Sequence, residues 1–434
     1  MRPSVWQPSG YNRSMNIQDN ATAASTGPVR HAPLSLGAFV AILAALMSLN
    51  ALATDIMLPG FPDIAGSLGL ASETQVQPVI TLYLVGFGLS QLFMGFLSDR
   101  YGRRPLLIGG LMVYGLAAIY TAFASDITSL LVARFVQGMG SAAPRVIATA
   151  AIRDCYEGRR MARVMSLTMT VFMAAPVLAP SIGQAILLAA SWRWTFGFLG
   201  LFCGLLLIIC AALFPETLPP EKRRAINPAM IGGAMLSLGR SRETMGYTLA
   251  AGTFFGAMFG YINSAQQIMV GIYGLGLWFP VAFAVMALAI SASSFVNSLL
   301  VERFGMRLIS HGAVVAYCVL SFAMALLGVE GQLSFWVFAP LMTLIMLLVG
   351  LVFSNFNALA MESQGHIAGV ASSFIGAITV LLGAGIGYVI GYHFDGTILP
   401  LALGFGFCGL FSLLLVIWTE KGKLFVSKNR VPRQ

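Results

Sequence analysis

The segment that decides the fold is Gly95-Phe96-Leu97-Ser98-Asp99-Arg100-Tyr101-Gly102-Arg103-Arg104-Pro105-Leu106-Leu107, which is short and charged and lies between two long apolar runs. Its two glycines permit backbone conformations that other residues resist. Pro105 has the fixed φ that suits the first turn of a following helix. The segment is therefore predicted to be a tight hairpin between two helices.

A second and weaker copy of this segment follows later in the chain. Residues 98–106 can be laid on residues 301–309, so that an acid, an Arg, an aromatic residue, a glycine and a second Arg recur in the same order. Apolar runs flank both copies. This pattern favours a duplication, in which each half of the chain forms one structural repeat.

The composition is that of a membrane protein. Hydrophobic residues make up 58% of the chain and charged residues only 9%, whereas a soluble domain carries roughly 25% charged residues. The chain divides into apolar segments of ~20 residues, each long enough to cross ~30 Å of hydrocarbon. We predict an all-α membrane protein with two pseudo-symmetric six-helix bundles and helices at 35–58, 76–97, 105–124, 128–152, 162–188, 194–214, 247–270, 278–300, 307–327, 334–357, 369–393 and 398–418.

The basic residues indicate how these helices are oriented. Of the 25 Lys and Arg residues, 22 fall at the N-terminus, in alternate loops or at the C-terminus. This asymmetry predicts that both termini are cytoplasmic. The net charge of +9 is then a topology signal, with a secondary role in holding anionic lipid, and does not indicate nucleic-acid binding. The expected domains are a disordered tail at 1–33, bundles at 34–214 and 247–420, a cytoplasmic linker at 215–246, and a cytoplasmic tail at 421–434.

No pattern in the chain indicates catalysis. The five cysteines form no C-x-x-C pair, and neither a G-x-x-x-x-G-K nor an H-E-x-x-H motif occurs. The polar segments are too short for a catalytic domain, so no enzymatic activity, metal or cofactor is expected. A membrane enzyme, a channel and a non-transporting sensor remain as less favoured alternatives. A membrane enzyme would need a cluster of His or acidic residues within the bilayer, and a channel more often has a re-entrant filter or oligomeric symmetry than two six-helix repeats.

Asp55 places a carboxylate inside the otherwise apolar first span. Such a group costs ~2.5–3.5 kcal/mol at the membrane centre, so it should face a partner or an aqueous cavity. Burial favours the neutral form of a carboxyl and a nearby Arg favours the ionised form, so alternating exposure could load and unload a proton. Asp55 is the leading candidate for a proton-coupling site. The alternative is an acid near the outer mouth that hydrogen-bonds a neighbouring helix end.

The span 128–152 carries a polar stripe. Its members recur at i, i+3, i+7 and i+11 and so share one helix face, which is expected to line the central cavity: Arg134, Gln137, Ser141 and Arg145. Arg134 is expected at a depth comparable to Asp55 and could set the charge state of a carboxylate or hold water; the alternative is a purely structural pair with Asp55. Arg145 could bind an anionic substrate or extend to the cytoplasmic interface.

The second half is poorer in charge. Its polar residues in the spans 247–270 and 334–357 could line the cavity and bind substrate, namely Asn263, Gln266, Gln267, Asn355 and Asn357. Hydrogen bonding between helices is an equally good interpretation of each one. The span 162–188 contains two prolines that should bend it and small residues spaced for close helix packing: Pro176, Ala179, Pro180 and Gly183.

The charged hairpin resembles, position for position, the G-x-L-[SA]-D-R-x-G-R-[RK] signature of the major facilitator superfamily. In that family the acid and Arg of the loop belong to a charge network that closes the cytoplasmic side. The resemblance implies this gating role for Asp99 and Arg100, with Asp154 as a partner. Gly95, Gly102, Arg103 and Arg104 belong to the same signature, and the resemblance implies a gating role for them as well.

Further motifs narrow the resemblance. R-x-x-Q-G at Arg134 is similar to the family's fourth-helix pattern, in which the Arg is implicated in proton transfer, and the segment around Pro176 resembles the fifth-helix signature of drug/proton antiporters. D-x-x-L-P at Asp55 is similar to the bicyclomycin/chloramphenicol-resistance branch. These likenesses imply a monomer in the bacterial cytoplasmic membrane that exports small amphipathic compounds in exchange for protons. The runner-up is an exporter of one metabolite, siderophore or amino-acid derivative; uptake by proton symport is less favoured.

Overall fold

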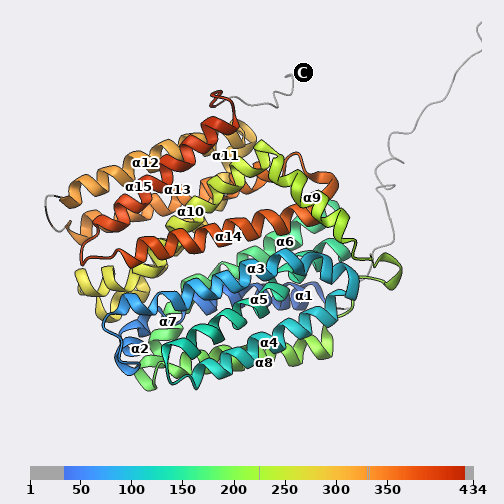
Figure 1. Cartoon of the computed structure of the whole chain (residues 1–434), viewed down its shortest axis with the longest axis horizontal. Coiled ribbons are helices and arrows are strands. Elements are labelled where there is room, and N and C mark those ends of the chain that lie inside the picture. Colours follow the sequence, from blue (N-terminus) through green and yellow to red (C-terminus); the bar gives the residue numbers. More distant parts are fainter. Residues whose placement is uncertain (1–33, 224, 330, 332, 426–434) are drawn as a thin grey trace, which may run out of the picture.

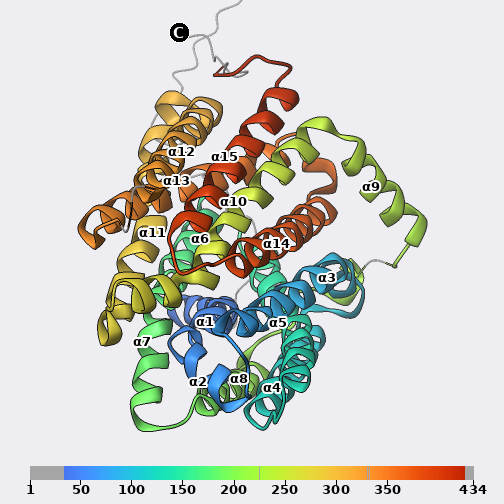
Figure 2. The ribbon, with the colours of Figure 1, turned by 60° about the vertical axis from the view of Figure 1, so that its left-hand side comes forward.

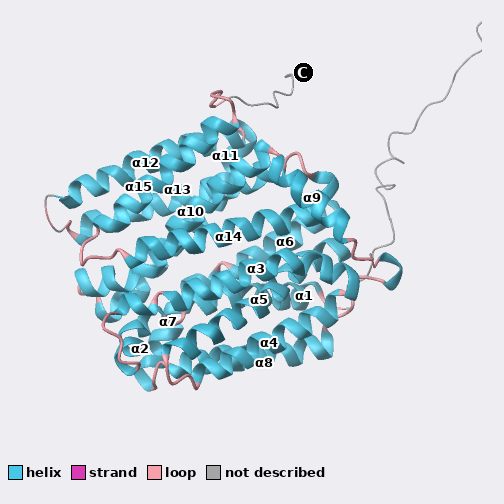
Figure 3. Ribbon diagram, viewed as in Figure 1, coloured by secondary structure: helices cyan, strands magenta, loops and turns pink. Residues whose placement is uncertain are grey.

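The computed structural model describes residues 34–223, 225–329, 331 and 333–425, and the described part of the chain is helical, without strands (Figure 3). The helices run side by side in two groups, with the N-terminal helices in blue and green on one side and the C-terminal helices in yellow to red on the other (Figure 1). The expected tail at 1–33 and residues 426–434 of the expected tail at 421–434 lie outside the described residues.

Each of the twelve expected spans has a helical counterpart. In the first half these are α1 (Leu36–Asp55), α3 (Pro78–Tyr101), α4 (Arg103–Ala122), α5 (Ile127–Cys155), α6 (Gly158–Phe172) with α7 (Ala174–Ala189), and α8 (Arg193–Leu213). In the second half they are α10 (Arg242–Gln266) with the π-helical η4 (Gln267–Ile272), α11 (Phe279–Phe304), α12 (Met306–Val329), α13 (Phe335–Met361), α14 (Ala368–Tyr392) and α15 (Leu399–Thr419).

Ten helical segments among the described residues are long and apolar enough to cross a membrane. The two remaining long helices, α5 and α10, fall short in hydropathy because they carry the polar residues singled out in the sequence. Polar side chains in a membrane helix normally face other helices or water. The interior of each half is therefore where α5 and α10 belong.

The helices differ from the prediction in three places. The span 162–188 is interrupted at Met173, between α6 and α7, because the ring of Pro176 conflicts with the carbonyl of the preceding turn. The linker 215–246 contains the helix α9 (Pro228–Arg240), which Figure 2 shows at the edge of the molecule, and α10 already begins within it. Shortly after α1, the chain also forms a short helix, α2 (Phe61–Ser67).

Glycines allow the helices to approach closely. A Cβ added to Gly138 of α5 would overlap the carbonyl oxygen of Tyr83, and one added to Gly86 of α3 would overlap that of Phe135. Such reciprocal contacts replace the hydrophobic driving force that is missing in lipid. The two halves meet along α3 and α14, where a Cβ on Gly88 would lie 2.9 Å from Leu381.

Candidate functional site

The charged hairpin is tighter than expected, because α3 and α4 are separated by a single residue. Gly102 has φ +99°, a conformation that favours glycine. This turn directs Arg103 back over α3, where its Nη1 lies 2.6 Å from Asp99 Oδ1 and its Nε lies 2.9 Å from Asp154 Oδ2. Arg103 is buried, and it joins the ends of three helices at one face of the N-terminal half.

The network predicted around Arg100 is centred on Arg103 instead. Arg100 is exposed and takes part in no ion pair of the described chain. The reason is that α3 continues to Tyr101, so Arg100 stays on the outward face of a helix. The expected partners Asp99 and Asp154 are both in the network. Arg104 turns away, and its Nη2 donates to Ala211 O at 2.6 Å.

Glu216 also belongs to this network and was not singled out from the sequence. Its carboxylate accepts from the backbone N–H of Arg103 at 2.9 Å and of Arg104 at 3.3 Å. These are the first two amides of α4, which have no partner inside the helix. A negative charge also suits the N-terminus of a helix. The only sequence signal was an acid directly after α8, at the start of the linker.

The second half contains a matching network around Arg307. Its Nη2 lies 2.8 Å from Glu362 Oε2, and its Nε lies 2.8 Å from Glu420 Oε1. Gly305, with φ +78°, makes the same one-residue turn between α11 and α12 that Gly102 makes in the first half. The alignment of residues 98–106 with 301–309 pairs Arg307 with Arg104. In the structure, however, Arg307 takes the role of Arg103, because each of them pairs with two acids at the end of its half. The networks support the predicted duplication.

The polar stripe on α5 is turned into the N-terminal half. Arg134 is completely enclosed: Nη2 donates to Ala53 O at 2.7 Å, Nε donates to Val79 O at 3.2 Å, and Nη1 donates to Gln137 Oε1 at 2.7 Å. Gln137 and Ser141 are 0% and 2% exposed, respectively. The expectation that these three residues line an open cavity is not met in this conformation, because α1 and α3 cover them.

Asp55 is the last residue of α1 and is 4% exposed. Its Oδ1 is enclosed without a hydrogen-bond partner among the described residues, and Asp55 takes part in no ion pair there, so the structural pair with Arg134 is absent. Arg134 nevertheless reaches the carbonyl of Ala53 and is thus at a similar depth. The helix α10 contacts the turn η1 (Leu58–Gly60), which follows Asp55, and the hydroxyl of Tyr261 in α10 is likewise enclosed without a described partner.

Arg145 differs from its neighbours on the stripe. It is half-buried, and its guanidinium carbon lies 5.3 Å from the ring centroid of Phe172, the last residue of α6. The ion pairs of the described chain do not include it. Among the predicted members of the stripe, only Arg145 retains substantial accessible surface.

Three of the five polar residues predicted in the second half join helices, namely Asn263, Asn355 and Gln267, whereas Asn357 bonds to Phe353 O of its own helix. Asn263 Nδ2 donates to Gly387 O at 3.1 Å, linking α10 to α14, and Asn355 Nδ2 donates to Asn297 Oδ1 at 2.7 Å, linking α13 to α11. Gln266 is buried, and its Oε1 has no partner in the described part of the chain. Gln267 accepts a hydrogen bond from Gln77 of the first half.

The predicted packing residues lie along α7. Ala179, Pro180 and Gly183 are buried, and a Cβ added to Gly183 would overlap the carbonyl oxygen of Ile56. Close contact between α7 and the end of α1 therefore depends on this glycine. Pro176 lies in the first turn of α7, directly after the break at Met173.

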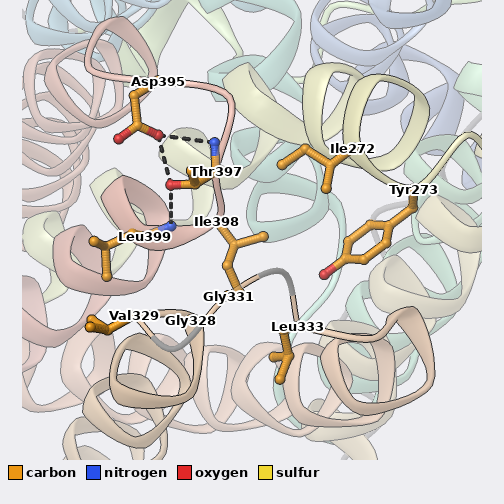
Figure 4. Close-up of a pocket in the computed structure, with 10 residues that line it drawn as sticks. All are labelled: Ile272, Tyr273, Gly328, Val329, Gly331, Leu333, Asp395, Thr397, Ile398 and Leu399. Atoms are coloured by element: carbon orange, nitrogen blue, oxygen red, sulfur yellow. Dashed lines mark hydrogen bonds between the residues drawn. The ribbon is translucent and has the colours of Figure 1, made fainter.

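A cavity of about 380 Å³ opens elsewhere, between the ends of helices in the second half. Figure 4 shows it beside the loop before α15, where Asp395 accepts hydrogen bonds from the backbone N–H and the hydroxyl of Thr397. The hydroxyl oxygen of Thr397 in turn accepts a hydrogen bond from the backbone N–H of Leu399 at 3.2 Å. Asp395 and Thr397 thus shape the loop, whereas the hydroxyl of Tyr273, which also lines the cavity, has no hydrogen-bond partner among the described residues. None of the predicted site residues lines this cavity.

Two helical repeats with buried polar residues at their centre and mirrored charge networks at one end define a multi-pass membrane transporter. The Major Facilitator Superfamily model matches residues 43–388. The chain belongs to this superfamily. It is 34% identical to the uncharacterized MFS-type transporter YdgK of Bacillus subtilis, over 85% of this chain and 91% of that protein.

Other relatives agree with this placement. A bicyclomycin resistance protein homolog of Haemophilus influenzae is 31% identical, over 87% of this chain and 94% of its own length. The crystal structure of the human organic anion transporter MFSD10 superposes with a TM-score of 0.62 at 17% identity, over 88% of this chain and all of that one, which shows the shared fold. The resemblance to the superfamily and to its drug-resistance branch, and the predicted fold class, are confirmed.

Proposed function

We propose that the protein exports small amphipathic compounds across the bacterial cytoplasmic membrane in exchange for protons. The observation that carries the proposal is Asp55, an enclosed acid without a cationic partner in the described chain, located where the first half meets α10. Relatives named for drug resistance support the direction of transport. In this proposal the protein is a transporter without catalytic activity.

Alternating access would use Asp55 as the proton carrier. An enclosed ionised carboxylate without a cation is costly, so a neutral carboxyl fits the present conformation best. Loss of the proton would favour a conformation in which water reaches Asp55. Arg134 would hold α1, α3 and α5 in register around this acid through its three hydrogen bonds.

The remaining features of the proposal concern topology and gating. The Arg103 and Arg307 networks would lie on the cytoplasmic side, with both termini, because basic residues accumulate there. They would hold the helix ends together while the outer end opens, with Asp99 and Asp154 as the acids of the first network and Arg100 facing headgroups. The two bundles would move within one monomer, with lipid, protons and a small molecule as its partners.

Proteoliposomes with an internal pH reporter test the proposal. Addition of a transported compound should release protons in the wild-type protein, and Asp55→Asn should abolish this release. Asp63→Asn is the matched control, because Asp63 is an exposed acid on α2, eight residues away. Unchanged proton release in Asp55→Asn would reject the coupling role. Responses to several drug classes would favour multidrug export.

An exporter dedicated to one metabolite, siderophore or amino-acid derivative is the second candidate. The half-buried Arg145, which takes part in no ion pair of the described chain, favours it, since a fixed cation selects among substrates by charge. A response of the pH reporter to a single compound, with none to the drug panel, would distinguish this candidate from the first.

A further inference from the structure

We propose that Arg145 and Phe172 form a subsite for the anionic group of the substrate, so that the preferred cargo is an amphipathic compound with a carboxylate or a similar monoanion. The inference rests on the proposed export function and specifies its substrate class. Three observations carry it: the contacts of Arg145, its depth in the helices, and its accessibility.

The guanidinium of Arg145 has an aromatic face on one side and no described acid within ion-pairing distance. Arg134, about three turns away on the same helix, donates from its nitrogens to two backbone carbonyls and to an amide oxygen. Arg145 makes no such side-chain bonds within the described chain. Its five N–H donors therefore remain available to a ligand.

The depth of Arg145 in α5 favours a site inside the helix bundle over an interfacial role. It precedes Cys155, the last residue of α5, by ten residues, which corresponds to ~15 Å of helical rise. Phe172 lies near the middle of the apolar segment Gly158–Ala189, where α6 gives way to α7. The stacked pair thus lies near mid-depth, where substrate sites of transporters with two repeats are found.

The side chain of Arg145 is not fully enclosed. The residue is half-buried, and it is absent from the described side chains whose polar atoms are enclosed without a partner. A cation at this depth requires water or an anion. A carboxylate matches the planar fork of guanidinium with two parallel hydrogen bonds, and the ring of Phe172 offers an apolar surface to the body of the same ligand.

Three dansyl probes of similar shape test the subsite: dansylglycine is anionic, dansylamide is neutral and dansylcadaverine is cationic. Their binding can be followed by energy transfer from the tryptophans of the purified protein in detergent without phospholipid. We expect dansylglycine to bind roughly 10- to 100-fold more tightly than dansylamide, as a charged hydrogen-bonded contact implies. Dansylcadaverine should bind more weakly than either.

Variants of Arg145 and Phe172 test whether these two residues cause the preference for dansylglycine. Arg145→Gln should reduce the dansylglycine preference to about onefold while dansylamide binding stays unchanged, and Arg145→Lys should retain part of it. Phe172→Leu should weaken the binding of all three probes. Arg160→Gln, which removes an exposed Arg after α5, is the matched control and should behave as the wild-type protein. These ratios would not move if Arg145 served only to stabilise the fold.

The outcomes separate this inference from the export function. If the wild-type protein binds dansylglycine and dansylamide equally, or if Arg145→Gln keeps the preference, the anionic subsite is overturned, even where neutral or cationic drugs still drive proton release. If the preference depends on Arg145 but no compound drives proton release, the subsite stands and proton-coupled export fails.

Discussion

Gln77 of the first half donates a hydrogen bond from Nε2 to Oε1 of Gln267 in the second half, at 3.1 Å. The same nitrogen lies 3.2 Å from the carbonyl oxygens of Asn263 and Gly391, and the residue is fully buried. Gln77 precedes α3, whereas these acceptors lie toward the ends of α10 and α14. A neutral amide thus fastens the two halves at the end of the molecule where Asp55 lies.

Replacing Gln77 with Leu should shift the protein toward a conformation that is open at this end. The variant loses these hydrogen bonds and leaves buried acceptors unpaired, which should cost the closed form about 1–3 kcal/mol. The population ratio would change by roughly 5- to 150-fold. Spin labels at Ser72 and Leu277, on exposed segments of the two halves, would report the change as a longer distance in a cysteine-free background.

The control for this prediction is Gln75→Leu. Gln75 is exposed, and its side chain accepts only a local hydrogen bond from Ala71 N at 3.0 Å. It should therefore leave the distance distribution unchanged. Equal distributions for Gln77→Leu and the wild-type protein would show that the amide does not hold the halves together.

The charge network at the other end should depend on Arg103 far more than on Arg100. Arg103→Gln leaves Asp154 without its cation in a poorly accessible site, although the hydroxyl of Thr217 still donates to it, and we expect a loss of about 2–3 kcal/mol in unfolding free energy. The contact of Arg103 with the more exposed Asp99 contributes little to the unfolding free energy. Arg100→Gln should stay within ~0.5 kcal/mol. Thermal unfolding in detergent measures both variants.

Transport by these two variants provides a second readout. Arg103→Gln should also lower the transport rate, because α3, α4 and α5 are no longer fixed at their ends. If Arg100→Gln proved the more damaging variant in both assays, the network described above would not be the one that operates in the membrane.

The fold could be predicted from the sequence because lipid leaves few choices. Apolar runs of sufficient length must be helices, and the duplicated hairpin fixes how they are grouped. The helix α9 was missed because its residues lie in a linker rich in small and polar residues, where neither length nor hydropathy indicates a span. The prolines correctly predicted that the span 162–188 bends. The bend lies at Met173, before Pro176, because a proline ring conflicts with the carbonyl one turn earlier in the helix.

The site could be predicted only in part. Period 3.6 correctly placed Arg134 and Gln137 on one face of α5, but it could not show that α1 and α3 cover this face. Sequence reasoning placed Arg100 in the charge network, whereas the structure places Arg103 there. The positive φ of Gly102 decides which Arg turns inward, and the sequence does not show this conformation. Gln77 had no sequence signal, because a polar residue at the start of a predicted span, next to other polar residues, resembles an ordinary helix end.

Gly183→Ala should strongly destabilise the protein. A Cβ at this position would overlap the backbone of Ile56, and backbone cannot give way as a flexible side chain does. Overpacking of this kind costs about 1–3 kcal/mol or more. Gly109→Ala is the matched control, because Gly109 is an α4 residue with no atom near its added Cβ; it should be neutral or stabilising by up to ~1 kcal/mol. Similar thermal stabilities for the two variants would contradict the close contact.

Arg134→Lys should be nearly as damaging as Arg134→Gln, although it keeps the charge. The guanidinium spans acceptors on α1, α3 and α5 and lies 4.5 Å from the ring centroid of Tyr83, a geometry that needs a planar fork. A single ammonium cannot reach all three acceptors, so at least one buried carbonyl loses its donor at a cost of about 1–3 kcal/mol.

Thermal stability and proton-coupled transport should therefore fall together in both Arg134 variants. A purely electrostatic role makes the opposite prediction, namely that Lys rescues transport while Gln does not. Measuring the two variants side by side, with Arg160→Lys as an exposed control, decides between a guanidinium that fixes three helices around Asp55 and a charge that acts on Asp55 from a distance.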